Sequence, residues 1–91
     1  MSTQEKAVIT VVGKNAIGIL AKVATCAAEA NTNVIQVSQI VMDEIFTMSM
    51  LVDISEMKGS IQDLENAIKD HLPGIEIHVM HENIFNSMHT I

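Results

Sequence analysis

The pattern of apolar and polar residues predicts four β-strands. Segment 6–12 is apolar on both faces, which is typical of a central strand. Segments 33–42 and 46–53 flank the polar dipeptide Asp43-Glu44, a pattern that predicts two strands joined by a tight hairpin. Segment 75–80 alternates again and predicts the fourth strand.

Apolar residues at helical spacing predict two amphipathic helices and a short third one. The stripe of the first helix consists of Ile17, Leu20, Ala24, Ala27 and Ala28, and Asn31-Thr32-Asn33 ends it. Ser60 and Asp63 form a capping pattern at the start of the second helix, which Pro73-Gly74 ends. The stripe of that helix consists of Ile61, Leu64, Ile68 and Leu72. Ile84, Phe85 and Met88 predict a short C-terminal helix.

The element order strand, helix, strand, strand, helix, strand predicts an α+β, ferredoxin-like βαββαβ sandwich. In this fold two helices cover one face of a four-stranded antiparallel sheet. We expect a single domain over residues 1–91, with a core at 6–82 and a helical tail at 83–91. The second face of the sheet and the edge of the second strand stay uncovered, and both features favour a homodimer through the sheet edge.

Composition narrows the classes of partner. The net charge is −6, and all five basic residues are scattered lysines, which argues against nucleic acid and against an anionic membrane surface. A single cysteine excludes an intrachain disulfide. The N-terminus lacks the apolar segment of a signal peptide, and no apolar run approaches the roughly 20 residues of a membrane span. We therefore expect a cytoplasmic protein.

The motif GKNAIG at residues 13–18 separates the first strand from the first helix and leaves two interpretations open. Glycine permits a positive φ angle and close approach of the backbone, so the motif could be turn geometry alone. The start of the following helix also offers free N–H groups to a carboxylate, so the motif could hold a small ligand. It is neither a dinucleotide fingerprint nor a P-loop, because the required glycine and lysine spacings are absent.

Residues with catalytic or metal-binding chemistry form no recognisable set. His78 and His81 are three apart on a strand, so they point to opposite faces and cannot share one ion. Cys26 lies in the first helix and is typical of a buried structural thiol. Asp43, Glu44 and Asp53 lie at solvated strand ends. We expect no catalytic residues, no metal and no cofactor, and hence a protein that is not an enzyme.

The quoted segments resemble a known family. The element order, the glycine pair of GKNAIG followed by IL, and Asn33 at the start of the second strand are similar to the ACT domain. NVIQVSQIVMDEIFTMSMLVD and the tail ENIFNSM further resemble small, free-standing, uncharacterised single-ACT-domain proteins of bacteria and archaea. The resemblance covers about residues 6–91.

The resemblance implies a regulatory module that binds a small effector, in many ACT domains an amino acid. ACT domains pair side by side into a continuous sheet, and the effector binds between the first loop of one copy and the second strand of the other. Carried onto this chain, the ligand-binding residues are Asn15, Ala16, Ile17, Gly18 and Asn33. The interface residues are Gln36, Ser38 and Gln39. Many amino-acid-binding members carry Asp at the position of Asn15, and a neutral side chain pairs less strongly with an ammonium group.

Two functions follow from this reading. The first is a dimeric sensor of an amino acid or a similar metabolite. The alternative is an adaptor or regulator that binds a partner protein without a metabolite, through the dimer surface or through the tail around Phe85 and Met88.

Overall fold

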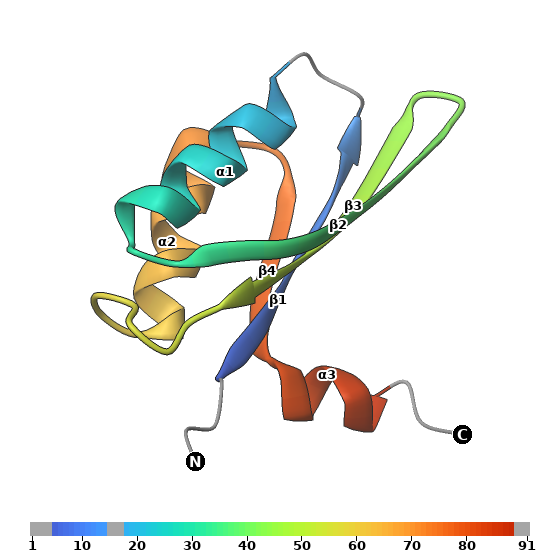
Figure 1. Cartoon of the computed structure of the whole chain (residues 1–91). Coiled ribbons are helices and arrows are strands. Elements are labelled where there is room, and N and C mark those ends of the chain that lie inside the picture. The colour runs from blue at the N-terminus through green and yellow to red at the C-terminus, as the bar shows by residue number, and fades with distance from the viewer. Residues whose placement is uncertain (1–4, 15–17, 89–91) are drawn as a thin grey trace.

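Seven elements make up the chain in the computed structural model, which describes residues 5–14 and 18–88 (Figure 1). They are β1 (Lys6–Lys14), α1 (Ile19–Glu29), β2 (Asn33–Met42), β3 (Ile45–Asp53), α2 (Ile61–His71), β4 (Glu76–His81) and α3 (Glu82–Met88). Their order and the four-stranded antiparallel sheet confirm the predicted ferredoxin-like α+β fold.

Strand β1 is one of the two central strands, as its two apolar faces predict. The strand order is β2-β3-β1-β4, so β1 pairs with both β3 and β4, and β2 and β4 form the two edges. Ala7, Ile9 and Val11 point to the face that α1 and α2 cover, and each is 0% exposed. Met48 and Met50 of β3 lie beside them in register and are also 0% exposed. The core is therefore a layer of aliphatic and methionine side chains between sheet and helices.

The buried face of α1 differs from the predicted stripe. Ile19, Val23, Cys26 and Ala27 are the buried residues of this helix. Leu20 is 36% exposed and Ala28 is exposed, so the prediction was wrong for them. Alanines surround this helix on several sides, and their small side chains give the sequence pattern little power to fix which side faces the sheet.

Helix α2 begins and is anchored as its sequence predicts. The Ser60 hydroxyl accepts from the Asp63 N–H at 3.1 Å, and the Asp63 carboxylate accepts from the Ser60 N–H at 3.0 Å, which completes a capping box. Leu64 and Ile68 face the sheet and are buried. Glu65 reaches from α2 to β4, where its carboxylate accepts from the Val79 N–H at 2.8 Å.

The two edges of the sheet are protected unequally. Strand β4 has 6 residues, and Glu65 satisfies one of its backbone donors. Strand β2 has 10 residues, and all of them are exposed. A long, open edge of this kind is a ready template for pairing with another strand.

None of the helices within residues 5–14 and 18–88 is long and apolar enough to cross a membrane. The C-terminal helix α3 lies on the side of the sheet opposite to α1 and α2 (Figure 1).

The Glu65 contact predicts a specific dependence of stability on pH. Burial by itself raises the pKa of Glu65, but the Val79 N–H, the Lys69 ammonium at 3.1 Å and Gln62 together outweigh it, so the pKa lies below its ordinary value of 4.5. A carboxyl with a lowered pKa stabilises the fold above its unfolded-state pKa and loses this contribution as the pH falls through the folded-state pKa. Glu65→Gln keeps an acceptor for Val79 but loses its charge, so we expect a loss of about 1 kcal/mol at pH 7.

Urea denaturation of wild type and Glu65→Gln between neutral pH and pH 3 checks this expectation. The gap in unfolding free energy between the two proteins should narrow as the solution is acidified below about pH 4.5. Glu44→Gln at the exposed hairpin tip is the matched control, with the same change of charge and no such bond. A gap for Glu65→Gln that is constant with pH contradicts the assignment.

Candidate functional site

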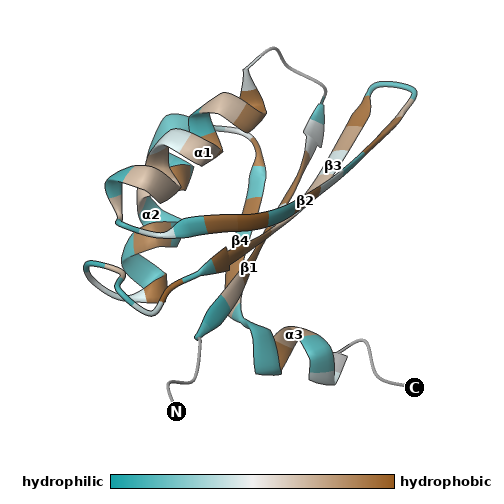
Figure 2. Cartoon of the chain, viewed as in Figure 1, coloured by the Kyte–Doolittle hydropathy of each residue, from teal (hydrophilic) through white to brown (hydrophobic). Residues whose placement is uncertain are grey.

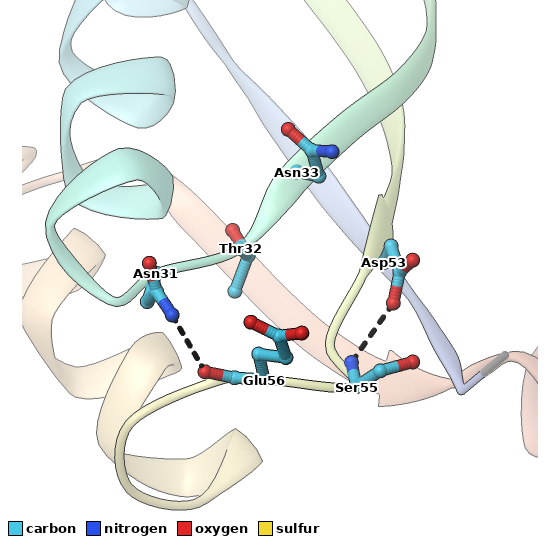
Figure 3. Close-up of a pocket in the computed structure, with 6 residues that line it drawn as sticks. All are labelled: Asn31, Thr32, Asn33, Asp53, Ser55 and Glu56. Carbon is cyan, nitrogen blue, oxygen red and sulfur yellow. Dashed lines mark hydrogen bonds between the residues drawn. The ribbon is translucent and has the colours of Figure 1, made fainter.

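A polar pocket lies where α1 turns into β2, beside the end of β3 (Figure 3). Its volume is about 300 Å³, and all of its lining residues are polar: Asn31, Thr32, Asn33, Asp53, Ser55 and Glu56. Asn33 and Asp53 are direct partners in the antiparallel pairing of β2 with β3. The pocket is thus built from two chain segments that the sheet register holds side by side.

The end of α1 shapes one wall of the pocket. Asn31 adopts a φ of 64°, a left-handed conformation that asparagine tolerates. The Thr32 N–H and the Thr32 hydroxyl both donate to the Ala27 carbonyl, at 3.0 and 2.8 Å. The backbone bond from Thr32 to Ala27, with Asn31 in this conformation, is the pattern of a Schellman C-cap. The polar triplet that the sequence predicts as a helix end therefore also fixes where β2 starts.

The segment after β3 forms the opposite wall of the pocket and is hydrogen-bonded to the wall formed by the end of α1. The Asn31 side-chain amide donates to the Glu56 carbonyl at 2.9 Å, and the Lys58 N–H donates to the Ala30 carbonyl at 2.9 Å. The Asp53 carboxylate accepts from the Ser55 N–H at 2.9 Å and holds the first residues of this segment. Figure 3 shows the Glu56 carboxylate in the gap between the two walls.

The charge of the lining selects the kind of ligand that fits. Asp53 is half-buried and Glu56 is exposed, and the lining includes no lysine. Carboxylates, hydroxyls and amides in this arrangement accept hydrogen bonds from an ammonium or hydroxyl group and repel an anion. Glu56 contributes only its backbone carbonyl to the bond with Asn31, so its carboxylate can contact a ligand.

Only two of the predicted ligand-binding residues, Gly18 and Asn33, lie in the described part of the chain, and these two lie far apart. Asn15, Ala16 and Ile17 lie outside the described residues. Gly18 and Asn33 lie at opposite ends of α1, whose 11 residues span about 17 Å. The strand register agrees, because Lys14, Ile45 and Met42 share one end of the sheet and Lys6, Asp53 and Asn33 share the other.

The predicted interface residues of β2 lie on both faces of the sheet. Gln36 pairs with Leu51 and Ser38 with Ser49, so these two side chains are on the face opposite to α1 and α2. Gln39 pairs with Met48, a core residue, and lies on the helix side. All three are exposed.

Sequence reasoning missed most of the polar pocket. The sequence pattern marks Asn31 and Thr32 only as a helix end and Asp53 only as a solvated strand end, and it gives no role to Ser55 or Glu56. The predicted β2–β3 hairpin could have indicated this site. An antiparallel hairpin must place the start of β2 beside the end of β3, so the turn before β2 and the turn after β3 lie together.

Both glycines that flank the predicted ligand loop have a structural reason to be glycine. A Cβ on Gly13 would lie 2.6 Å from Cδ1 of Ile75, so Gly13 allows close packing against the segment before β4. Gly18 adopts a φ of 85° at the start of α1 and has open space around it. Close packing at Gly13 and backbone conformation at Gly18 therefore account for both residues without a ligand.

Cys26 has the surroundings of a structural thiol. Its side chain is 3% exposed, and burial, followed by the negative charge of Glu29, raises the pKa of the thiol. His71 comes close, with 3.6 Å between the Cys26 sulfur and the His71 Nδ1 atom. That same Nδ1 atom lies 2.9 Å from the Ala67 carbonyl, which can only accept a hydrogen bond. Nδ1 thus carries a proton in this contact and cannot take one from the thiol.

Comparisons with known proteins agree with this fold. The sequence model of the ACT domain matches residues 5–80, so the chain belongs to the ACT domain family. A UPF0237 protein of Clostridium perfringens is 46% identical over 87 residues, which cover 93% of this chain and 98% of that protein. ACT domains are in general regulatory modules that bind small molecules.

Solved structures show the same similarity. An ACT domain protein from Streptococcus pneumoniae is 38% identical, with a TM-score of 0.74 over 91% of this chain and 96% of that one. A formyltetrahydrofolate deformylase from Pseudomonas syringae shares the fold alone, at 14% identity and a TM-score of 0.76 over 88% of this chain and 28% of the deformylase.

Three glycine variants separate backbone geometry from packing at this loop. Gly18→Ala meets no atom within 4 Å but needs a φ of 85°, so we expect a loss of about 1–2 kcal/mol. Gly18→Asn should lose less, because asparagine tolerates this conformation. Gly13→Ala displaces the Ile75 side chain and should cost on the order of 1 kcal/mol. Urea denaturation measures all three, and equal losses for Gly18→Ala and Gly18→Asn would contradict the geometric account.

Proposed function

We propose that this chain is a regulatory module that senses an amino acid or a similar small metabolite, and that the ligand binds where two copies pair along β2. The observation that carries the proposal is the position of the polar pocket, which begins on the open edge strand at Asn33.

The exposed residues of β2 support pairing between two copies. Ile35 is 46% exposed and Ile40 is 57% exposed, which is a large apolar area for a strand in contact with water. Figure 2 shows hydrophobic colouring along this outer strand. Pairing through β2 satisfies its free backbone groups and covers these side chains in one step.

A two-fold axis would also complete the ligand site. Antiparallel pairing of β2 with a second copy places the start of one strand beside the end of the other. The pocket at Asn33 then faces the end of the partner's sheet from which its α1 starts, near Gly18 of the partner. The separation of Gly18 and Asn33 within one chain is what such a shared site requires.

The lining chemistry fits an amino acid. The carboxylates of Asp53 and Glu56 accept the ligand ammonium and so supply the charge that the neutral Asn15 lacks. The ligand carboxylate meets the free N–H groups at the start of α1 of the partner. Binding then favours the paired state, because only that state contains both halves of the site.

Glu56→Gln tests the proposal with little risk to the fold, because the bond that ties the two walls uses the Glu56 backbone. Wild type is screened by thermal shift against the twenty amino acids, and affinity for the responding one is measured by calorimetry. We expect Glu56→Gln to bind it about tenfold or more weakly, as for the loss of one charged hydrogen bond.

Glu76→Gln on the opposite edge strand β4 is the charge-matched control and should bind like wild type. No response to any amino acid, or equal affinity of wild type and Glu56→Gln, contradicts the proposal. A stoichiometric protein that co-purifies with an unresponsive chain supports the adaptor instead. The exposed apolar residues Ile40, Met42 and Ile45 at the β2–β3 hairpin favour that alternative.

A further inference from the structure

The sheet face opposite to α1 and α2 carries a polar row across all four strands. The strand registers align Ser38 of β2, Ser49 of β3, Thr10 of β1 and His78 of β4. Residues in register on adjacent strands share one face, so these side chains lie in line across the sheet. On the side toward the tail, the next row starts with the polar Gln36 of β2 and continues with Leu51, Val8 and Met80, which are apolar. A hydrogen-bonding strip therefore borders an apolar strip on the same surface.

Helix α3 turns this surface into a cavity. The chain leaves β4 and folds α3 over the apolar strip, on the side of the sheet away from the other helices (Figure 1). The cavity between α3 and the sheet measures about 240 Å³ and is lined by Val8, Gln36, Ser38, Ser49, Leu51, Glu82, Phe85 and Asn86. It shares no residue with the polar pocket at Asn33. The chain thus has a second concave surface with its own lining.

The lining divides into an apolar part and a hydrogen-bonding part. Val8, Leu51 and Phe85 provide the apolar wall, and Phe85 is half-buried against it. Ser38 and Ser49 are hydroxyl groups that can donate or accept. In the described part of the chain, neither of these hydroxyls has a hydrogen-bond partner.

Glu82 gives the cavity its charge. Its side chain is half-buried and lines the cavity, and it has no ion pair or hydrogen bond with any residue of the described ranges. No lysine contributes to the lining. A partly desolvated carboxylate without a partner attracts a cation and repels an anion.

We propose that this cavity binds a small primary amine with an apolar body. The ammonium group pairs with Glu82, the hydroxyls of Ser38 and Ser49 take a second polar group, and the apolar body packs against Phe85 and Leu51. The volume lies slightly below the roughly 300–1,000 Å³ of pockets for drug-sized ligands, so the ligand is compact. The site lies within one chain and stands independently of the proposed sensing of amino acids between two copies.

Two probes with the same phenyl ring and opposite charge test this site. Phenethylamine and phenylpropionate are titrated separately into the ¹⁵N-labelled protein at millimolar concentration, and amide resonances are followed by NMR. We expect the amine to shift the resonances of Ser49, Leu51 and Phe85 in a saturable manner, and phenylpropionate to leave them unchanged. Amine shifts confined to Asn33, Asp53 and Ser55, or equal responses to both probes, would overturn the assignment.

Charge and packing variants sharpen the result. Glu82→Gln should weaken amine binding about tenfold, which is the scale of one charged hydrogen bond, while Glu44→Gln should bind like wild type. Leu51→Ser, on the sheet side of the cavity, should also weaken amine binding. Because this residue lies outside α3, the variant tests the site even if Glu82→Gln disturbs that helix. Unchanged affinity in both Glu82→Gln and Leu51→Ser would overturn the proposal.

Discussion

The covering of a four-stranded sheet by only two helices on one face is the constraint on which this structure depends. The side chains of β1 on that face are fully buried, and the cluster around Ile9, Met48 and Ile68 supplies most of the core. Two helices of 11 residues each cover this face. They leave the other face of the sheet and the long β2 edge uncovered. The short helix α3 covers part of the open face, and Glu65 satisfies part of the β4 edge. All 10 residues of strand β2, in contrast, are exposed.

The polar pocket at Asn33 and the cavity under α3 both follow from this incomplete cover. The polar pocket forms where the uncovered strand begins, because the Schellman turn at Asn31 and the segment after Asp53 are held together there. The second cavity forms where α3 bridges the open face without filling the space above Ser38 and Ser49. In the proposed function, the same open edge that needs a partner also brings the second half of the ligand site. Pairing and ligand binding are then coupled, because each contributes contacts that the other needs.

The sequence predicted the elements that depend on local chemistry. The capping pair Ser60 and Asp63, the hairpin at Asp43-Glu44 and the alternation in β3 each act over a few residues, so the pattern alone located them. The buried side of α1 could not be predicted in the same way, because its many alanines fit either a core or a surface. The polar pocket could not be predicted from any local sequence pattern, because Asn33 and Glu56 come together only through the register of two strands. A ligand role for the loop at residues 13–18 stays a prediction, and packing and backbone conformation explain Gly13 and Gly18.

The central claim is that β2 pairs with β2 of a second copy, and amide hydrogen exchange measured at several protein concentrations tests it most directly. If this pairing occurs, the β2 amides that point away from β3 exchange slowly at high concentration and faster on dilution, in step with a dimer-to-monomer transition in analytical ultracentrifugation. Amides of β3, which are paired within the chain, should show no such dependence. Fast exchange of these outward-pointing amides at every concentration, or protection of them that does not change as the dimer dissociates, would contradict the account.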